Sequence, residues 1–371
     1  MGTRFQMKPL IAILMVLVLT ACTRAPQIIG VINPEVPVNS VVDLTKHRVF
    51  IISTREASEV VGAFFSAERA PELALASVDA TIPPTHVTGM LERPEKLPPD
   101  PRTEFTVVNP IIYEGNNTFV SEVNRELAKR APGDRRLLVF VHGFNNTASE
   151  AILRLAQFVE DTGFTGVPVL YTWASAAKGS AYVYDINSAL VARSKLDEMA
   201  EILSKTKAES VDVFAHSMGT FLTMEGLTRA HAQGKLGTRT RINHIVLASP
   251  DIDIDLFQTQ ITELPPAILE KMYLLISKDD VALRISRRIA GGVPRVGAAD
   301  VEALEAFGVT VIDLGQVSDS TSGSHSKFAG SPEVVQLIGV GLNSNRDFGA
   351  SGQDRPLDEL LDGVPVRIFR N

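Results

Sequence analysis

The stretch Val211-Asp-Val-Phe-Ala-His-Ser-Met-Gly219 is an apolar, strand-like run that ends on a serine, Ser217, between small residues. This pattern is typical of a nucleophile elbow, the sharp strand-to-helix turn of the G-x-S-x-G motif, in which small neighbours let strand and helix approach closely. Ala215 stands where the motif has its first glycine. Apolar residues recur at helical spacing after Gly219, so the sequence predicts strand, turn and helix in the order that the motif requires.

A nucleophilic serine needs a histidine base and a carboxylate that orients the histidine, because the serine alcohol is barely reactive at neutral pH. In elbow-type sites the acid and then the histidine follow the serine, each in a loop after its own strand. The apolar run 272–276 leads into Asp279 and Asp280, and the run 309–314 is followed by His325. These positions predict a serine hydrolase site with one of the two aspartates as its acid.

The site also needs an oxyanion hole, which usually pairs the N–H after the nucleophile with an N–H from an earlier strand-end loop. The apolar run 137–141 leads into His142-Gly-Phe-Asn-Asn146, where Gly143 permits a bent backbone. The predicted donors are therefore the amides of Phe144 and Met218. An ordinary turn is the alternative, since glycine and asparagine favour turns. The position after a buried strand and before the elbow favours the functional interpretation.

Eight apolar runs alternate with helical patterns along the chain, at 49–52, 105–108, 137–141, 167–171, 211–214, 245–247, 272–276 and 309–314. This alternation predicts an α/β fold with a mostly parallel central sheet and helices on both faces. A hydrophobic content of 45% and a charged content of 21% suit one sizeable globular domain.

The chain resembles a bacterial lipoprotein branch of the alpha/beta hydrolase superfamily, a domain of unknown function similar to esterases and lipases. The resemblance covers about residues 47–335 and rests on Val49-Phe-Ile-Ile-Ser-Thr-Arg55, Pro83-Pro-Thr-His-Val-Thr-Gly89, Val139-Phe-Val-His-Gly-Phe-Asn145, Tyr171-Thr-Trp-Ala-Ser175, Ala215-His-Ser-Met-Gly219, Ala248-Ser-Pro-Asp-Ile-Asp253, Ser277-Lys-Asp-Asp-Val-Ala-Leu283 and Gly323-Ser-His325. It implies the alpha/beta hydrolase fold, with Ser217 as nucleophile, Asp280 as acid and His325 as base. Family spacing favours Asp280 over Asp279.

The chain departs from the pattern of this family at two positions. Ala174 stands where the family often has proline, and Ala215 replaces the first glycine of the elbow motif. Neither departure removes a chemical group, so the implied catalytic set is unaffected.

The N-terminal residues predict a lipoprotein signal peptide over residues 1–21. Lys8 precedes the apolar run 10–19, which is too short to span a bilayer comfortably, and Leu19-Thr-Ala-Cys22 follows. This ending resembles the lipobox, in which the cysteine is acylated and becomes the new first residue. A stop-transfer helix is the main alternative, but Pro9 and the polar flank limit its length.

Cys22 is the only cysteine, which excludes an intrachain disulfide. Thr23 and Arg24 follow it, and the absence of Asp there resembles lipoproteins exported to the outer membrane. The predicted location is the bacterial cell envelope, lipid-anchored in the outer membrane and facing the periplasm. The membrane itself is a predicted partner, and the protein is expected to bind it through the lipid anchor on Cys22.

Proline and polar residues divide the remainder of the chain. Pro26, Pro34 and Pro37 mark a linker over 22–44, followed by the hydrolase domain over 45–342 and a partly mobile tail over 343–371. A zone with six prolines, residues 81–102, is expected to wrap the edge of the sheet.

Charge and residue clusters exclude other classes of function. The net charge of −7 and the lack of a basic cluster argue against nucleic acid, and the arginines at 284, 287 and 288 are expected to form a solvated helix face. Asp251, Asp253 and Asp255 either bind a metal ion or belong to a capped loop, and the absence of a neighbouring histidine favours the loop. We therefore expect no metal and no cofactor.

Several aromatic and histidine residues allow two interpretations. Trp173, Tyr182 and Tyr184 follow a predicted strand and either line a substrate pocket or pack beneath the sheet edge. His216 is expected to pack and form hydrogen bonds rather than act as a base. The histidines at 47, 86, 231 and 244 have no partner that the sequence identifies.

The leading hypothesis is a carboxylesterase or lipase-like enzyme that acts on a small-molecule or lipid ester through an acyl-serine intermediate. One alternative is a non-catalytic binding or scaffold lipoprotein of the envelope, against which the intact set of serine, aspartate and histidine argues. The other is an acyltransferase. No protein partner can be named from the residues.

Overall fold

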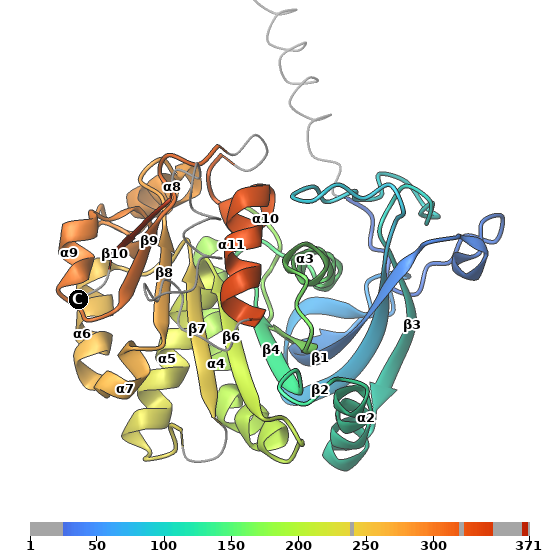
Figure 1. The fold of residues 1–371 in the computed structure, drawn as a ribbon, viewed down its shortest axis with the longest axis horizontal. Helices are drawn as coiled ribbons and strands as arrows, with labels where there is room; N and C mark the ends of the chain where they lie inside the picture. The colour runs from blue at the N-terminus through green and yellow to red at the C-terminus, as the bar shows by residue number, and fades with distance from the viewer. Residues whose placement is uncertain (1–24, 238–240, 319–322, 344–365, 370–371) are drawn as a thin grey trace, which may run out of the picture.

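The computed structural model describes residues 25–237, 241–318, 323–343 and 366–369. These residues form a sheet whose strands lie in the order β10-β9-β8-β7-β6-β4-β5-β1-β2-β3 (Figure 1). The strands are β1 (Thr45–Ala57), β2 (Phe65–Ile82), β3 (Thr106–Tyr113), β4 (Arg136–Val141), β5 (Val167–Thr172), β6 (Ser210–His216), β7 (Ile242–Ala248), β8 (Met272–Ile276), β9 (Thr310–Asp313) and β10 (Arg367–Phe369).

The central strands, from β9 across to β1, all pair in parallel. At one end of the sheet β2 pairs antiparallel with both β1 and β3, and at the other end β10 pairs antiparallel with β9. Together with the helices on both faces, this mostly parallel sheet confirms the predicted fold class.

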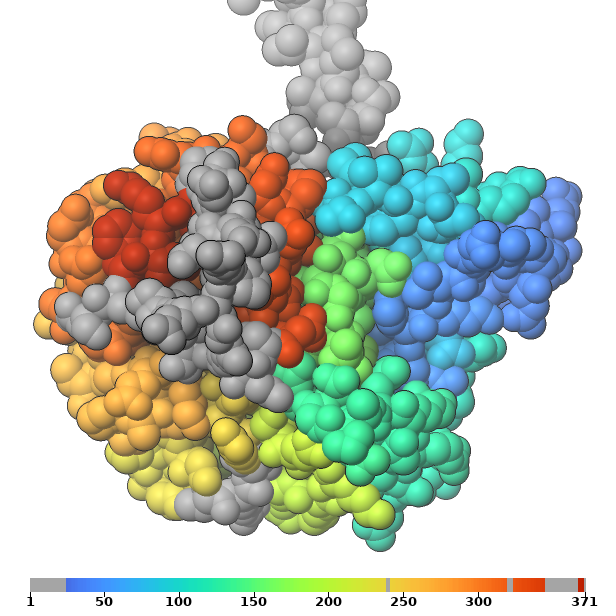
Figure 2. Space-filling model, viewed as in Figure 1, coloured from blue at the N-terminus to red at the C-terminus, as the bar shows by residue number. Residues whose placement is uncertain are grey.

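Helices cover the two faces of the sheet in separate groups. One group is α2 (Asn116–Ala128), α4 (Tyr182–Ser204), α5 (Met218–Ala232), α6 (Ile254–Glu263) and α9 (Val301–Glu305). The other group is α3 (Ala148–Thr162), α10 (Lys327–Gly330) and α11 (Pro332–Asn343). The remaining short helices are α7 (Pro266–Leu269), α8 (Val281–Ile289), η1 (Val38–Ser40) and η2 (Val296–Ala298). Figure 2 shows the later part of the chain, in yellow to red, packed beside the earlier part, in blue to green.

Strand β4 shows why the central strands are apolar throughout. Leu137, Val139 and Val141 belong to the apolar cluster on one face, whereas Leu138 and Phe140 belong to the cluster on the other face. Successive side chains of a strand point to opposite faces. A strand covered by helices on both sides therefore needs a continuous apolar run, which is the pattern that the sequence shows.

The segment 22–44, expected to be a linker, is attached to the domain over part of its length. Ile28 and Ile29 are buried, and the amide of Ile29 donates to the carbonyl of Gly62 at 2.9 Å. Strand β10 falls within the segment expected to be a tail. The predicted signal peptide and Cys22 lie outside the described residues.

Residues 81 and 82 of the proline-rich zone belong to strand β2, and the rest of the zone, residues 83–102, lies against helix α3. His86 binds Asp161 near the C-terminal end of α3, and Arg93 binds Glu150 near its N-terminal end. A Cβ on Gly89 would lie 3.3 Å from the carbonyl oxygen of Gly330, just before α11. The zone thus connects the β2–β3 end of the sheet to the C-terminal helices.

None of the helices in the described part of the chain combines the length and the apolar character that crossing a bilayer requires.

Candidate active site

Ser217 occupies a strained turn between β6 and α5. Its backbone has φ 54° and ψ −124°, a conformation that residues with a side chain rarely adopt. The turn is held by the amide of Ser217, which donates to the carbonyl of Ala248 at 2.9 Å, and by the amide of Thr220, which donates to the carbonyl of Ser217 at 2.9 Å. This is the geometry of a nucleophile elbow.

Two glycines let the surrounding backbone approach this turn. A Cβ on Gly219 would lie 2.5 Å from the carbonyl oxygens of Val141 and His142, and a Cβ on Gly143 would lie 2.8 Å from the Cβ of Ser217. Only glycine fits at either position without displacing the backbone. The loop after β4 is thereby brought against the side chain of Ser217, a residue that is only 4% exposed.

His325 is held by Asp280. The Nδ1 atom of His325 lies 2.8 Å from Oδ2 of Asp280, whose side chain is fully buried. The other carboxylate oxygen of Asp280 accepts from the amide of Leu283 at 2.9 Å and caps helix α8. Helix α8 therefore fixes the carboxylate, and the carboxylate orients the imidazole.

The backbone of His325 is tied to the elbow. His216 Nε2 donates to the carbonyl of His325 at 3.0 Å, and Ser249 Oγ donates to the same oxygen at 3.0 Å. Burial and the neighbouring His325 hold the pKa of His216 well below its usual range, so His216 is a neutral hydrogen-bond donor. Its role is structural, in line with the sequence interpretation.

The rings of His216 and His325 lie with their centroids 4.8 Å apart, so His325 is next to the elbow. Among the described residues, no hydrogen bond joins the Ser217 hydroxyl to the His325 ring. Hydrogen bonds of this kind are often long in a free enzyme and shorten when substrate binds.

The loop 142–146 after β4 is rigidly supported by Trp173. The indole Nε1 of Trp173 donates to the carbonyl of His142 at 2.8 Å, and its backbone amide donates to His142 Nε2 at 3.2 Å. The two rings are stacked with centroids 5.2 Å apart. Burial and the charge of Arg55 lower the pKa of His142 to about 3, so its imidazole is neutral and acts as a structural acceptor. Trp173 is therefore a packing residue of this loop.

Arg55 and Asp185 hold the far side of the same loop. Arg55 is buried and donates through Nη2 to the carbonyl of Asn146 at 2.8 Å. Asp185 accepts from the amide of Asn145 at 3.3 Å. Helix α3 begins directly after the loop with a capping box formed by Thr147 and Glu150.

Phe144 and Met218, the predicted oxyanion donors, lie in this loop and at the start of helix α5. Within the described ranges, no hydrogen bond uses either amide. The loop lies against the elbow through Gly143, so both amides belong to the same small region around Ser217.

A buried polar cluster lies beside the elbow, and the sequence analysis, which considered Tyr182 and Asp251 separately, did not indicate that its members come together. Tyr182 donates to Asp251 at 2.9 Å and contacts Ser286 at 2.8 Å, and Arg295 lies 3.4 Å from Asp251. The amide of Asp251 contacts the carbonyl of Ser217 at 3.4 Å. Its members are scattered over more than a hundred positions, so no motif signals them.

Two further candidates of the sequence analysis, Asp253 and Tyr184, have structural partners. Asp253 caps helix α6 by accepting from the amides of Asp255 and Leu256. Tyr184 donates to the carbonyl of Ala67 at 3.1 Å and packs against Arg69, and both residues lie on strand β2. In the described part of the chain, no three His, Cys, Asp or Glu side chains come together as metal ligands.

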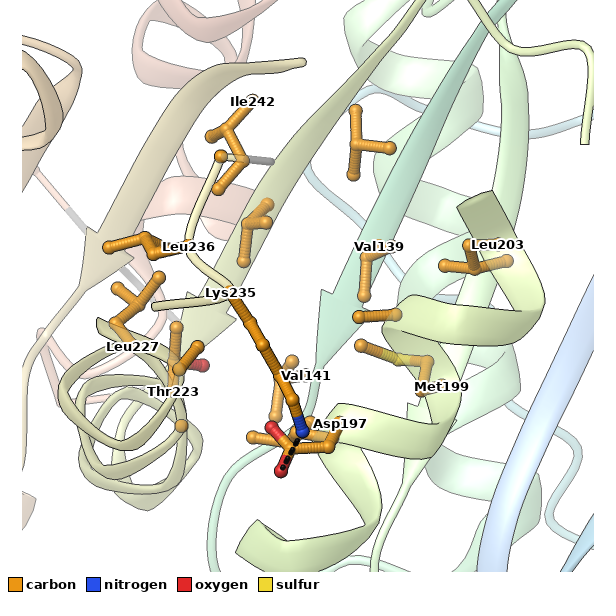
Figure 3. Close-up of a pocket in the computed structure, with 17 residues that line it drawn as sticks. Val139, Val141, Asp197, Met199, Leu203, Thr223, Leu227, Lys235, Leu236 and Ile242 are labelled. Carbon is orange, nitrogen blue, oxygen red and sulfur yellow. Dashed lines mark ion pairs between the residues drawn. The ribbon is translucent and has the colours of Figure 1, made fainter. Parts of the chain in front are cut away.

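The described residues also enclose an apolar cavity of about 160 Å³ (Figure 3). It is lined by α4, α5 and the sheet, and includes Val211 and Ile242 at the starts of β6 and β7. Ser217 follows the opposite end of β6. Lys235 and Asp197 form an ion pair of 3.8 Å at this cavity. None of Ser217, Asp280 and His325 lines it.

A model of the family described as alpha/beta hydrolase of unknown function (DUF900) matches residues 116–341. No curated protein matches the chain significantly. Solved structures that resemble it include an esterase from Rhizomucor miehei at 13% identity, covering 83% of this chain and 86% of that chain with a TM-score of 0.35. Carboxyl esterase 2 from Tuber melanosporum has 10% identity, 92% and 99% coverage and a TM-score of 0.37. Lipase B from Aspergillus fumigatus has 14% identity, 67% and 62% coverage and a TM-score of 0.38.

Proposed function

The chain belongs to the alpha/beta hydrolases of unknown function (DUF900), and on that premise we propose that it is a membrane-anchored serine hydrolase that cleaves carboxylic esters. The observation that carries this proposal is the position of His325. Its Nδ1 lies 2.8 Å from the buried carboxylate of Asp280, and its carbonyl is bound by His216, the residue next to Ser217.

In the proposed reaction, Ser217 Oγ attacks the carbonyl carbon of the ester while His325 Nε2 takes the hydroxyl proton. The Asp280 carboxylate accepts from His325 Nδ1 and stabilises the imidazolium. The amides of Phe144 and Met218 donate to the oxyanion of the tetrahedral intermediate. Collapse breaks the ester C–O bond, and His325 returns its proton to the departing alcohol.

Water then cleaves the acyl-serine. His325 removes a proton from the water as its oxygen attacks the acyl carbonyl, and the second tetrahedral intermediate expels Ser217 Oγ, which recovers the proton. An ester is the proposed substrate class because an alcohol is a better leaving group than an amine. Its departure therefore depends less on protonation by His325, the general acid.

The anchor in this proposal is a set of acyl chains on Cys22, in the outer membrane of a bacterial envelope and facing the periplasm. The lipobox-like Leu19-Thr-Ala-Cys22 and the preceding apolar run support it. Several chains on one cysteine bind a bilayer firmly, since each buried methylene contributes about 0.8 kcal/mol.

The test is to treat the purified protein with a fluorophosphonate probe and to locate the adduct by mass spectrometry. We expect one adduct on Ser217, because labelling needs an activated serine, and we expect His325→Ala to abolish it. A folded protein that is not labelled would favour the scaffold alternative. Product analysis with an added alcohol distinguishes hydrolysis from acyl transfer.

A further inference from the structure

Helix α8 buries little of its surface. Only Leu283 and Ser286 are buried among its residues, whereas Val281, Ile285 and Ile289 are 42%, 51% and 54% exposed. Residues four apart lie on the same side of a helix, so these three form one continuous apolar strip on the surface. Isolated exposed apolar residues are common, but an aligned strip needs an explanation.

The same helix carries Arg284, Arg287 and Arg288, all exposed, as the sequence indicated. Successive residues of an α-helix are rotated by about 100° around its axis. This rotation places Arg284 and Arg288 along one side of the apolar strip. No ion pair involving Arg284 or Arg288 is present within the described ranges. The chain as a whole has a net charge of −7, so this helix with three exposed arginines differs in charge from the rest of the chain.

The buried side of α8 faces the candidate active site. The helix begins directly after Asp280, and the amide of Val281 donates to the carbonyl of Gly323 at 3.1 Å, two residues before His325. Ser286 contacts Tyr182 at 2.8 Å. Helix α8 therefore packs directly against the loop that carries His325 and against the buried polar cluster of Tyr182 and Asp251.

The start of the described chain lies on the same side of the molecule. In Figure 1, α8 and the zone 83–102 both lie at the top. Asn33 donates to the carbonyl of Pro99 at 3.2 Å, so the first described segment runs beside this zone. The apolar run 10–19 and Cys22 precede this segment in the chain.

We propose that helix α8 is a lipid-contacting element whose apolar strip enters the interface of an anionic bilayer. Val281, Ile285 and Ile289 bury their side chains among the acyl chains, and Arg284 and Arg288 bind lipid phosphates. A basic helix with a separate apolar side is typical of interfacial helices. This contact is independent of whether Ser217 is catalytic.

The test uses the full chain with Cys22→Ser, so that an introduced cysteine is the only thiol. One protein carries Ile285→Cys and a control carries Val191→Cys, which is 49% exposed on helix α4. Each is labelled with an environment-sensitive nitrobenzoxadiazole fluorophore and mixed with phosphatidylglycerol or phosphatidylcholine vesicles. Because both proteins keep the same N-terminal segment, the label reports only whether its own position contacts lipid.

We expect a blue shift and a severalfold rise in emission at position 285 with phosphatidylglycerol, a smaller change with phosphatidylcholine, and none at position 191. Adding Arg284→Gln and Arg288→Gln to the 285-labelled chain should remove the difference between the two lipids. Equal responses at the two positions, or no response at 285, would overturn the proposal.

Two further outcomes would also overturn it. Blue-shifted emission at 285 before vesicles are added, lost on dilution, would show that a second copy of the chain covers α8. The same emission independent of dilution would show that another segment of the chain covers it. Fluorophosphonate labelling of the same proteins reports separately on the proposed catalytic function.

Discussion

Asp279 and Asp280 are neighbours in the chain, yet they contact different parts of the structure. Asp280 is buried and binds His325, whereas Asp279 is half exposed and binds Ser324 at 2.6 Å and Lys327 at 3.0 Å. Asp279 lies in the turn after β8 and Asp280 follows the turn, so the two side chains point in different directions and have separate roles.

Replacing each aspartate by asparagine separates these roles. Asp280→Asn should lower kcat by about 10⁴-fold, because the amide favours the wrong tautomer of His325. Asp279→Asn should weaken the contact with Lys327 and lower the melting temperature, while kcat changes little. Ester turnover and thermal unfolding of both variants measure this. The assignment of the acid is wrong if Asp279→Asn alone abolishes turnover.

The candidate site could be predicted from the sequence where its residues fall at strand ends. Ser217, the two aspartates and His325 each follow an apolar run, and parallel strands bring their carboxyl ends to one edge. The supporting residues could not be predicted in the same way. Arg55 and Asp185 act through hydrogen bonds to a loop that is distant in sequence, and periodicity carries no information about such pairs.

At the scale of one element, the loop 142–146 depends on Trp173. Trp173→Phe keeps an aromatic ring but leaves the buried carbonyl of His142 without its indole donor. We expect a loss of about 1–3 kcal/mol in the free energy of unfolding. We also expect a lower kcat, since the same loop carries the Phe144 amide.

Tyr171→Phe is a matched control. It removes a buried hydrogen bond of 2.8 Å to the carbonyl of Ala192, which lies further along helix α4 than Tyr182 and Asp185, the residues of this helix that contact the loop. Both variants should lose stability, but only Trp173→Phe should lose kcat. Unfolding is followed by circular dichroism because Trp173 is the only tryptophan. Equal losses of kcat would mean that the loop has no special role.

The predicted strands illustrate which elements a sequence reveals. All eight apolar runs fall on strands, but β2, the longest strand described, was missed. Its first half contains Glu68, Arg69 and Pro71 and is only partly buried, and its second half is built mostly of small residues. This strand is held by pairing with β1 and β3 rather than by a run of large apolar side chains.

At the scale of the whole molecule, His86 fastens the zone 83–102 to helix α3. Burial alone would lower the pKa of His86, but hydrogen bonds to Asp161 and Glu92 raise it from 6.5 to about 9. A folded-state pKa above the unfolded value means that protonation stabilises the fold. The contribution is complete below pH 6.5 and is lost as the pH rises through about 9.

His86→Gln should therefore melt several degrees below the unchanged protein at pH 6, since hydrogen bonds to charged groups contribute about 1.5–3 kcal/mol. The difference should shrink at pH values above about 9, where His86 is neutral in both states. Melting temperatures of the two proteins across this range measure it. A difference that is constant with pH would mean that the charge on His86 contributes nothing.

Strand β10 gives β9 a partner on its outer side, through Arg367, Ile368 and Phe369. Unpaired backbone groups at the edge of a sheet are a template for pairing with another molecule, and natural proteins cover or disrupt such edges. These three residues therefore cover the edge of β9 and leave only a very short strand at this end of the described sheet, which is one way in which proteins limit self-association. Cutting the chain back before Arg367, or straining β10 with a fused tag, would turn the exposed backbone of β9 into an aggregation site even where catalysis is untouched.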